Sequence, residues 1–280
     1  MELPMNIQKA VRKYEPIKNG GLTLYPVLVA EYDTFSVARP ALEVMHQSLP
    51  VALMRIPLLS ALYQMDYEAA LAGTQPSGLF SRALLALALS LRLGEGLTLE
   101  ERVGQFHIAV DRQDPKRLKC LRFTDKDGET KEIAPVQFQE LRQIIAAQNG
   151  VRPESDFANP EIVKAKQKMA SVGSIRLDVK LDDLIAAVSA LSGVDEAEIE
   201  DWPILKLERR SASYQRILSY LVCGIGEMSG TSWKGGNPTP HPFFQREDDG
   251  SGLFSSVTER GDREPPKAAR NIIEQTKDLL

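Results

Sequence analysis

Apolar positions recur at intervals of three and four along most of the chain, the spacing of amphipathic helices. This pattern predicts helices over residues 58–73, 181–193 and 204–228. The stretch RALLALALSLRL, residues 82–93, is apolar on all sides and shorter than the roughly 20 residues that span a bilayer. We therefore interpret it as a helix buried in a core.

The hydrophobic pattern changes after residue 100. QFHIAV, RLKCLRF and ETKEI have the pattern of strands, and the turn sequences DRQDP and DKDG separate them. The following stretch, APVQFQELRQIIAAQNG, carries Phe138, Leu141, Ile144 and Ile145 on one helical stripe. These segments predict a small antiparallel meander capped by a helix.

The sequence thus favours a mainly α protein with a small antiparallel β-meander, an α+β class in which helical N-terminal and C-terminal regions flank the meander. The expected order is a flexible arm (1–22), a helical region (23–100), the meander plus helix (101–150), a helical region with a helix-turn-helix-like turn (151–230), a Pro/Gly-rich segment with a polar linker (231–264) and an amphipathic helix (265–280).

Composition and charge narrow the function classes. The net charge is -4 and the pI about 5.6, which gives no global field to attract nucleic acid or anionic membrane. Two distant cysteines, Cys120 and Cys223, indicate a reduced, intracellular protein. They and the scattered histidines do not form a zinc-ligand spacing. No secretory signal and no catalytic motif such as G-x-S-x-G or H-E-x-x-H is visible, so we expect neither an enzyme nor a metal centre.

Glycines cluster in CGIGEMSGTSWKGGNPTPHPFF, residues 223–244. Gly224, Gly226 and Gly230 spell G-x-G-x-x-x-G, but a dinucleotide loop needs a strand before it and a helix after it. Here a predicted helix precedes the glycines and prolines follow them. Lys234 also lacks the glycine spacing of a phosphate loop. The glycines are therefore expected to end a helix, and no cofactor is expected.

Two apolar segments near the C-terminus are candidate partner-binding sites. Aromatic residues among prolines and glycines can dock into a groove or pack back on their own domain. The last predicted helix presents a mostly apolar stripe and is marginal alone in water, so it needs a partner, another copy of the chain or its own domain to pack on. The candidate partner-binding residues are Trp233, Phe243, Phe244, Ile272, Ile273 and Leu279.

The stretch SALSGVDEAEIEDW matches a helix-turn-helix template at Gly193, Val194, Ile199 and Trp202. The second helix of this template would carry five acidic residues between 195 and 201 and no Lys or Arg, so phosphates would repel it. Asp195 and Glu198 also fit a capping box, a structural role. We expect no specific binding to duplex DNA, although a DNA-binding regulator stays a second hypothesis.

Two segments resemble a known class of proteins. GLTLYPVLVAEYDTFSVARPAL and DWPILKLERRSASYQRILSYLVCGIGEMSGTSWKGGNPTPHPFF are similar to proteins encoded in tail-morphogenesis regions of bacteriophages and prophages of Gram-positive bacteria. Several of these are described as tail assembly chaperones. The resemblance implies a mostly helical protein of the bacterial host cytoplasm, without catalytic residues, that binds the tape-measure protein or another tail protein. A homo-oligomer and a structural component of the virion are further hypotheses.

Overall fold

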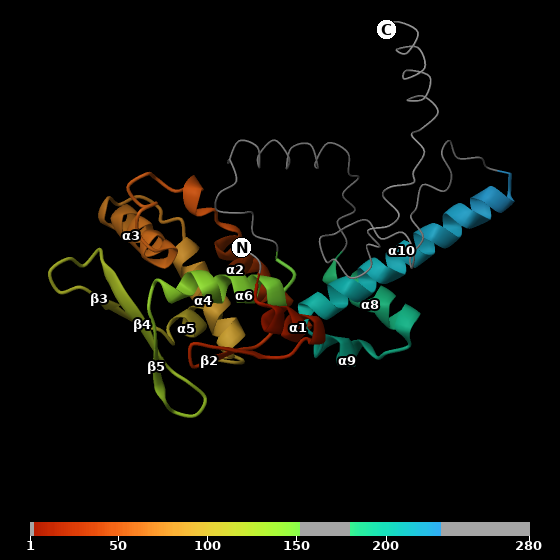
Figure 1. Ribbon diagram of the computed structural model, residues 1–280, viewed down its shortest axis with the longest axis horizontal. Coiled ribbons are helices and arrows are strands. Elements are labelled where there is room, and N and C mark those ends of the chain that lie inside the picture. The colour runs from red at the N-terminus through yellow and green to blue at the C-terminus, as the bar shows by residue number, and fades with distance from the viewer. Residues whose placement is uncertain (1–2, 152–179, 231–280) are drawn as a thin grey trace, which may run out of the picture. The chain divides into compact units, whose positions relative to one another are not determined.

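The computed structural model describes residues 3–151 and 180–230 (Figure 1). The chain forms two units, Met1–Ala212 and Ser213–Leu280. The helices are α1 (Met5–Lys13), α2 (Tyr32–Glu43), α3 (Leu58–Leu71), α4 (Leu79–Leu91), α5 (Leu99–Val103), α6 (Gln137–Gln148), α8 (Leu181–Ser192), α9 (Glu196–Glu200) and α10 (Ile204–Met228), with short 3-10 turns η1 (Val29–Glu31) and η2 (His46–Ser48). The strands are β1 (Ile17–Asn19), β2 (Leu22–Leu24), β3 (His107–Val110), β4 (Leu118–Thr124) and β5 (Thr130–Ile133).

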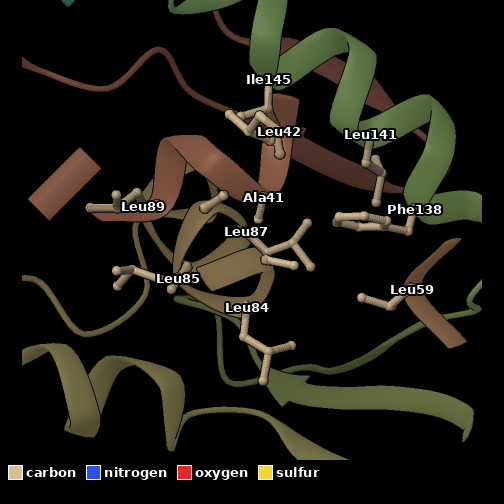
Figure 2. Packing of buried hydrophobic residues seen from close by; sticks show 14 of the residues in the cluster. Ala41, Leu42, Leu59, Leu84, Leu85, Leu87, Leu89, Phe138, Leu141 and Ile145 are labelled. Atoms are coloured by element: carbon tan, nitrogen blue, oxygen red, sulfur yellow. The ribbon is translucent and has the colours of Figure 1, made fainter. Parts of the chain in front are cut away.

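Helix α4 is central to the core of the first unit. Every residue from Ala83 to Leu91 is buried, because α2, α3, α5 and α6 all contact this helix. Figure 2 shows Leu87 of α4 among side chains of α2 and α6, including Leu42 and Phe138. A helix enclosed by neighbours needs no polar face, which explains its uniformly apolar sequence. The prediction of a buried core helix is confirmed.

The meander forms as predicted, with β4 between β3 and β5 in an antiparallel sheet. Leu121 in the middle strand pairs with Ile108 on one side and Ile133 on the other. The ring of Phe123 meets that of Phe106 edge to face, with centroids 5.6 Å apart. Phe106, Leu121, Phe123 and Ile133 belong to the same buried cluster as the side chains of α4 and α6, whereas Ile108 is exposed, so one core extends across residue 100. The α+β class is therefore confirmed.

The N-terminal residues correct one prediction. Where the sequence predicted a flexible arm, Met5–Lys13 forms α1 and buries Ile7 and Val11. Strands β1 and β2 follow as a hairpin whose turn places Gly20 and Gly21 at positive φ. Ile7 and Val11 lie one helical turn apart and anchor the helix to the core, with Ala10 packed partly buried beside them.

Helix α2 also differs from its predicted bounds. Pro40 suggested a helix start, but the helix begins at Tyr32 and encloses the proline. The ring removes the hydrogen bond that residue 40 would donate and crowds the carbonyl four residues earlier, while Phe35, Ala38 and Leu42 bury the inner face of the helix. Burial of this face outweighs the lost hydrogen bond.

The segment after residue 180 joins the N-terminal loop within the first unit. The Val29 N–H donates to the Trp202 carbonyl at 2.8 Å, and the Ile204 N–H donates to the Val27 carbonyl at 3.0 Å. Ile204 and Leu205 enter the main core. The start of α10 is therefore fixed by both backbone hydrogen bonds and apolar burial.

Candidate partner-binding surface

Helix α10 is anchored at its first turns and spans 25 residues. Ile204, Leu205 and Leu207 are buried in the first unit. Next to them, the Lys206 ammonium lies 3.7 Å from the centre of the Trp202 ring. Burial, and then the nearby Arg210 charge, lower the pKa of Lys206. An anchored first turn removes the nucleation cost of a helix, so the rest of α10 can extend without packing along its whole length.

The C-terminal half of α10, which belongs to the second unit, exposes a row of large apolar side chains. Their exposed fractions are 46% for Leu218, 52% for Leu221, 67% for Val222, 63% for Ile225 and 92% for Met228. Spacings of three and four place these residues on one side of the helix. We call these five residues the α10 stripe. Contiguous exposed apolar surface of this kind marks interaction sites.

The charged residues of this half of α10 are Arg216 and Glu227, and both occupy backbone positions on the side of the helix opposite Leu218. Arg216 is the only charged residue between 211 and 226. Counted at 100° per residue, its backbone position is about 160° from that of Leu218, on the opposite side of the helix. The stripe is therefore an uncharged apolar surface, suited to another apolar helix rather than to an acidic or basic ligand.

The predicted partner-binding residues Trp233, Phe243, Phe244, Ile272, Ile273 and Leu279 lie outside the described residues. The glycine pattern lies partly inside them. Gly224 and Gly226 are interior positions of α10, and Gly230 follows its end at φ +90°. Glycines inside a helix do not form the loop before a helix N-terminus that a dinucleotide site requires.

The helix-turn-helix-like segment forms a tight turn between α8 and α9. Gly193 ends α8 at φ +70°, and the Ser189 hydroxyl donates to the Val194 carbonyl at 2.7 Å. The Asp195 carboxylate accepts the Ala197 N–H at 2.9 Å and so caps the start of α9, although the predicted capping box would use the N–H of Glu198 instead. The predicted turn geometry is therefore present.

Helix α9 does not have the form of a recognition helix. It has five residues, and Ile199 is fully buried. The adjacent Trp202 is also buried, and its carbonyl is bonded to the Val29 N–H. Asp195, Glu196 and Glu198 supply the charge at its start. A recognition helix needs an exposed face that carries basic or amide side chains into a groove, and α9 instead packs beside η1.

An open cleft of about 440 Å³ lies between the start of α3, the β3–β4 loop and the start of α6. Its lining includes Ser60, Gln64, Lys116 and Val136. Lys116 is held by Glu68, with Nζ and Oε1 3.1 Å apart. The described residues that line the cleft include no histidine and no cysteine. The cleft thus supplies polar and charged groups beside Ser60.

Within residues 3–151 and 180–230, no group of three or more His, Cys, Asp or Glu side chains could hold a metal ion. Over the same residues, no helix combines the length and the apolar content needed to cross a membrane. Comparisons with protein-family models, with curated proteins and with solved structures give no match. The α10 stripe is therefore the main candidate site that the described residues provide.

Proposed function

We propose that this protein is a tail assembly chaperone, or another interaction protein of phage tail morphogenesis, that binds the tape-measure protein in the host cytoplasm. The observation that carries this proposal is the α10 stripe. It lies within residues 201–244, one of the two segments that resemble phage tail proteins. A row of exposed apolar residues on an anchored helix suits the binding of an amphipathic helix from a partner.

The exposure of the stripe supports a binding role over a purely structural one. Leu221, Val222 and Ile225 are each at least half exposed. Full burial of such a side chain is worth about 1.5–3 kcal/mol, so the exposed half or more of each leaves a corresponding part of that stabilisation unused. A partner with its own apolar stripe would recover part of that free energy on binding. An assembly chaperone has this task, since it covers apolar surface of another protein until assembly begins.

The DNA-binding alternative has little support in the geometry. The short acidic α9, with Ile199 buried, gives no surface suited to a DNA groove. The virion-component alternative makes a different prediction. A chaperone leaves before the particle is complete, whereas a structural component is retained in purified mature particles. Mass spectrometry of such particles separates the two.

Co-purification tests the chaperone proposal directly. The tagged full chain is expressed with the tape-measure protein of the same phage or prophage, as wild type, Ile225→Glu and Ser219→Glu. Ser219 is exposed on the same helix but lies off the stripe, so it receives the same charge as a control. We expect wild type and S219E to retain the tape-measure protein and I225E to lose it. Retention by I225E equal to that of wild type contradicts the proposal.

A further inference from the structure

The apolar positions of α10 follow a seven-residue repeat. Steps of three and four alternate along the helix, with the polar Ser211 as an exception at one core position, which gives an average period of 3.5 residues. A period of 3.5, rather than the 3.6 of a straight helix, is the period of a coiled coil, in which one helix packs along another. The core positions of the repeat are Ile204, Leu207, Ser211, Tyr214, Leu218, Leu221, Ile225 and Met228.

We propose that two copies of this chain pair through α10, with the core positions from Tyr214 to Met228 forming a coiled coil between them. The inference rests on the proposed function in that it assigns a second partner to the α10 stripe. When the tape-measure protein, the proposed client, is absent, the α10 stripe of one copy covers that of the other. Client and second copy then compete for the same surface.

The positions that flank the core favour a second copy as the occupant. In heptad notation, Leu218 is at position a and Leu221 at position d. The flanking e and g positions then hold Gln215, Ile217, Val222 and Gly224. Two identical helices place identical residues near each other, so charges of one sign at these positions would repel. Here these positions carry no charge. Pairs of different helices commonly use complementary charges there for specificity, and this helix lacks them.

The first unit prepares the helix for pairing. Ile204 and Leu207 occupy the first a and d positions and are buried in the core of their own unit. The exposed part of the repeat therefore continues a helix that is already nucleated. The exposed repeat spans about two heptads, which is short for a coiled coil. We therefore expect a dimer that dissociates on dilution rather than a permanent one.

Residues 265–280 of the same chain, whose sequence also repeats apolar positions at steps of three and four, are the competing occupant of the α10 stripe. The repeat of this C-terminal segment places Ala269 and Thr276 where a copy of α10 places Leu218 and Ile225. Alanine and threonine bury less apolar surface than leucine and isoleucine, so the copy is the better complement. If the segment covered the stripe within one chain, the wild type would be a monomer, and Ile272→Glu would increase its self-association.

Sedimentation velocity of the purified full chain over a concentration series tests the inference. Wild type and Ser219→Glu should form the same concentration-dependent dimer. Leu221→Glu should raise the dimer Kd by about a hundredfold or more, because two carboxylates would enter an apolar seam. Ile272→Glu should leave the Kd unchanged. Unaltered circular dichroism of L221E, expected because Leu221 is half exposed, shows that folding is intact.

A wild type that stays monomeric at every concentration overturns the inference, and so does an L221E dimer as tight as that of wild type. A gain of self-association in I272E overturns it in favour of the C-terminal segment. The experiment uses the purified chain without client, so its result is independent of co-purification with the tape-measure protein. If no dimer forms but the chain still binds the tape-measure protein, the inference of pairing fails and the proposed function stands.

Discussion

The side-chain oxygen of Asn149, at the end of α6, accepts a hydrogen bond from the backbone N–H of Val27, 122 residues earlier, at 2.9 Å. Both residues are buried. The preceding residue, Gln148, donates its side-chain amide to the Leu24 carbonyl at 3.1 Å. Two consecutive side-chain amides at the end of α6 therefore bond the backbone where the chain leaves β2, at the last strand residue Leu24 and at Val27 in the following loop.

We predict that Asn149→Ala lowers the free energy of unfolding by about 1–3 kcal/mol, since it leaves the Val27 N–H buried without an acceptor. Urea denaturation of wild type and variant measures the difference. Asn6→Ala removes the same amide from an exposed position of α1 and should change stability by less than about 0.5 kcal/mol. Equal effects of the two substitutions would contradict the assignment of a role to the hydrogen bond.

A second prediction concerns the ion pair of Arg102 and Glu31, whose Nη2 and Oε1 atoms are 2.6 Å apart. The side chains are 7% and 23% exposed. Glu31→Ala should cost about 2–3 kcal/mol, because the Arg102 charge would stay buried without its carboxylate. The Arg39–Glu43 pair has a similar separation, 2.8 Å, but both side chains are 45% exposed.

Glu43→Ala is therefore the matched control, with an expected cost of about 0.3–0.5 kcal/mol. Chemical denaturation of both variants under the same conditions provides the comparison. If Glu31→Ala proves as mild as Glu43→Ala, burial does not set the strength of the first pair.

A third prediction concerns pH and the capping box at the start of α5. The Thr98 backbone N–H and hydroxyl both donate to the Glu101 carboxylate, at 3.0 and 2.9 Å. These hydrogen bonds, with that from the backbone first, lower the pKa of Glu101 below its usual 4.5. A lowered pKa in the folded state adds stability that is present above pH 4.5 and lost as pH falls through the folded-state value.

Glu101→Gln keeps an acceptor at this position but removes the charge. We therefore expect wild type to be more stable than the variant near neutral pH, and the difference to shrink toward about pH 3. Urea denaturation at both pH values measures it. A difference that is independent of pH would show that the carboxylate charge is not its source.

A fourth prediction compares two glycines. Gly224 has helical backbone in α10, and an added Cβ would meet open space. Gly224→Ala should stabilise the helix by about 0.5–1 kcal/mol and increase hydrogen-exchange protection of neighbouring amides. Gly73 also has open space around it but adopts φ +66° after α3.

Gly73→Ala should therefore destabilise the protein. Strain of the left-handed backbone should lower the free energy of unfolding by about 1 kcal/mol. Thermal unfolding of this variant completes the comparison. Stabilisation by both substitutions would mean that the backbone of residue 73 is not held in the left-handed region.

Elements with a strong local signal were predictable from the sequence. The meander could be located because turn sequences bound each strand, and α4 because its apolar run had no polar face to expose. Helix α1 was missed because it has only nine residues, so its apolar spacing repeats too few times to stand out, and only contact with the core shows that Ile7 and Val11 are buried. Pro40 gave a false helix start, since a proline inside a helix and one at its start look alike in sequence.

Capping and exposure were harder to infer. The full capping box forms at Thr98 and Glu101, which the sequence analysis did not single out. Helix α10 was predicted with its observed bounds, but the sequence did not indicate that its apolar side is exposed to solvent. Periodicity identifies which residues share a side of a helix, whereas burial depends on segments elsewhere in the chain. The candidate surface could therefore be recognised only from the structure.

The bond between the Ile204 N–H and the Val27 carbonyl has a consequence for synthesis of the chain. A ribosome releases the N-terminal residues first, and folding proceeds as later residues appear. The Val27 carbonyl and the Val29 N–H meet their final hydrogen-bond partners only after Ile204 and Trp202 have left the exit tunnel. Until then the N-terminal loop lacks two of its backbone hydrogen bonds. A nascent chain arrested before residue 202 should therefore be more sensitive to protease at this loop than the finished protein.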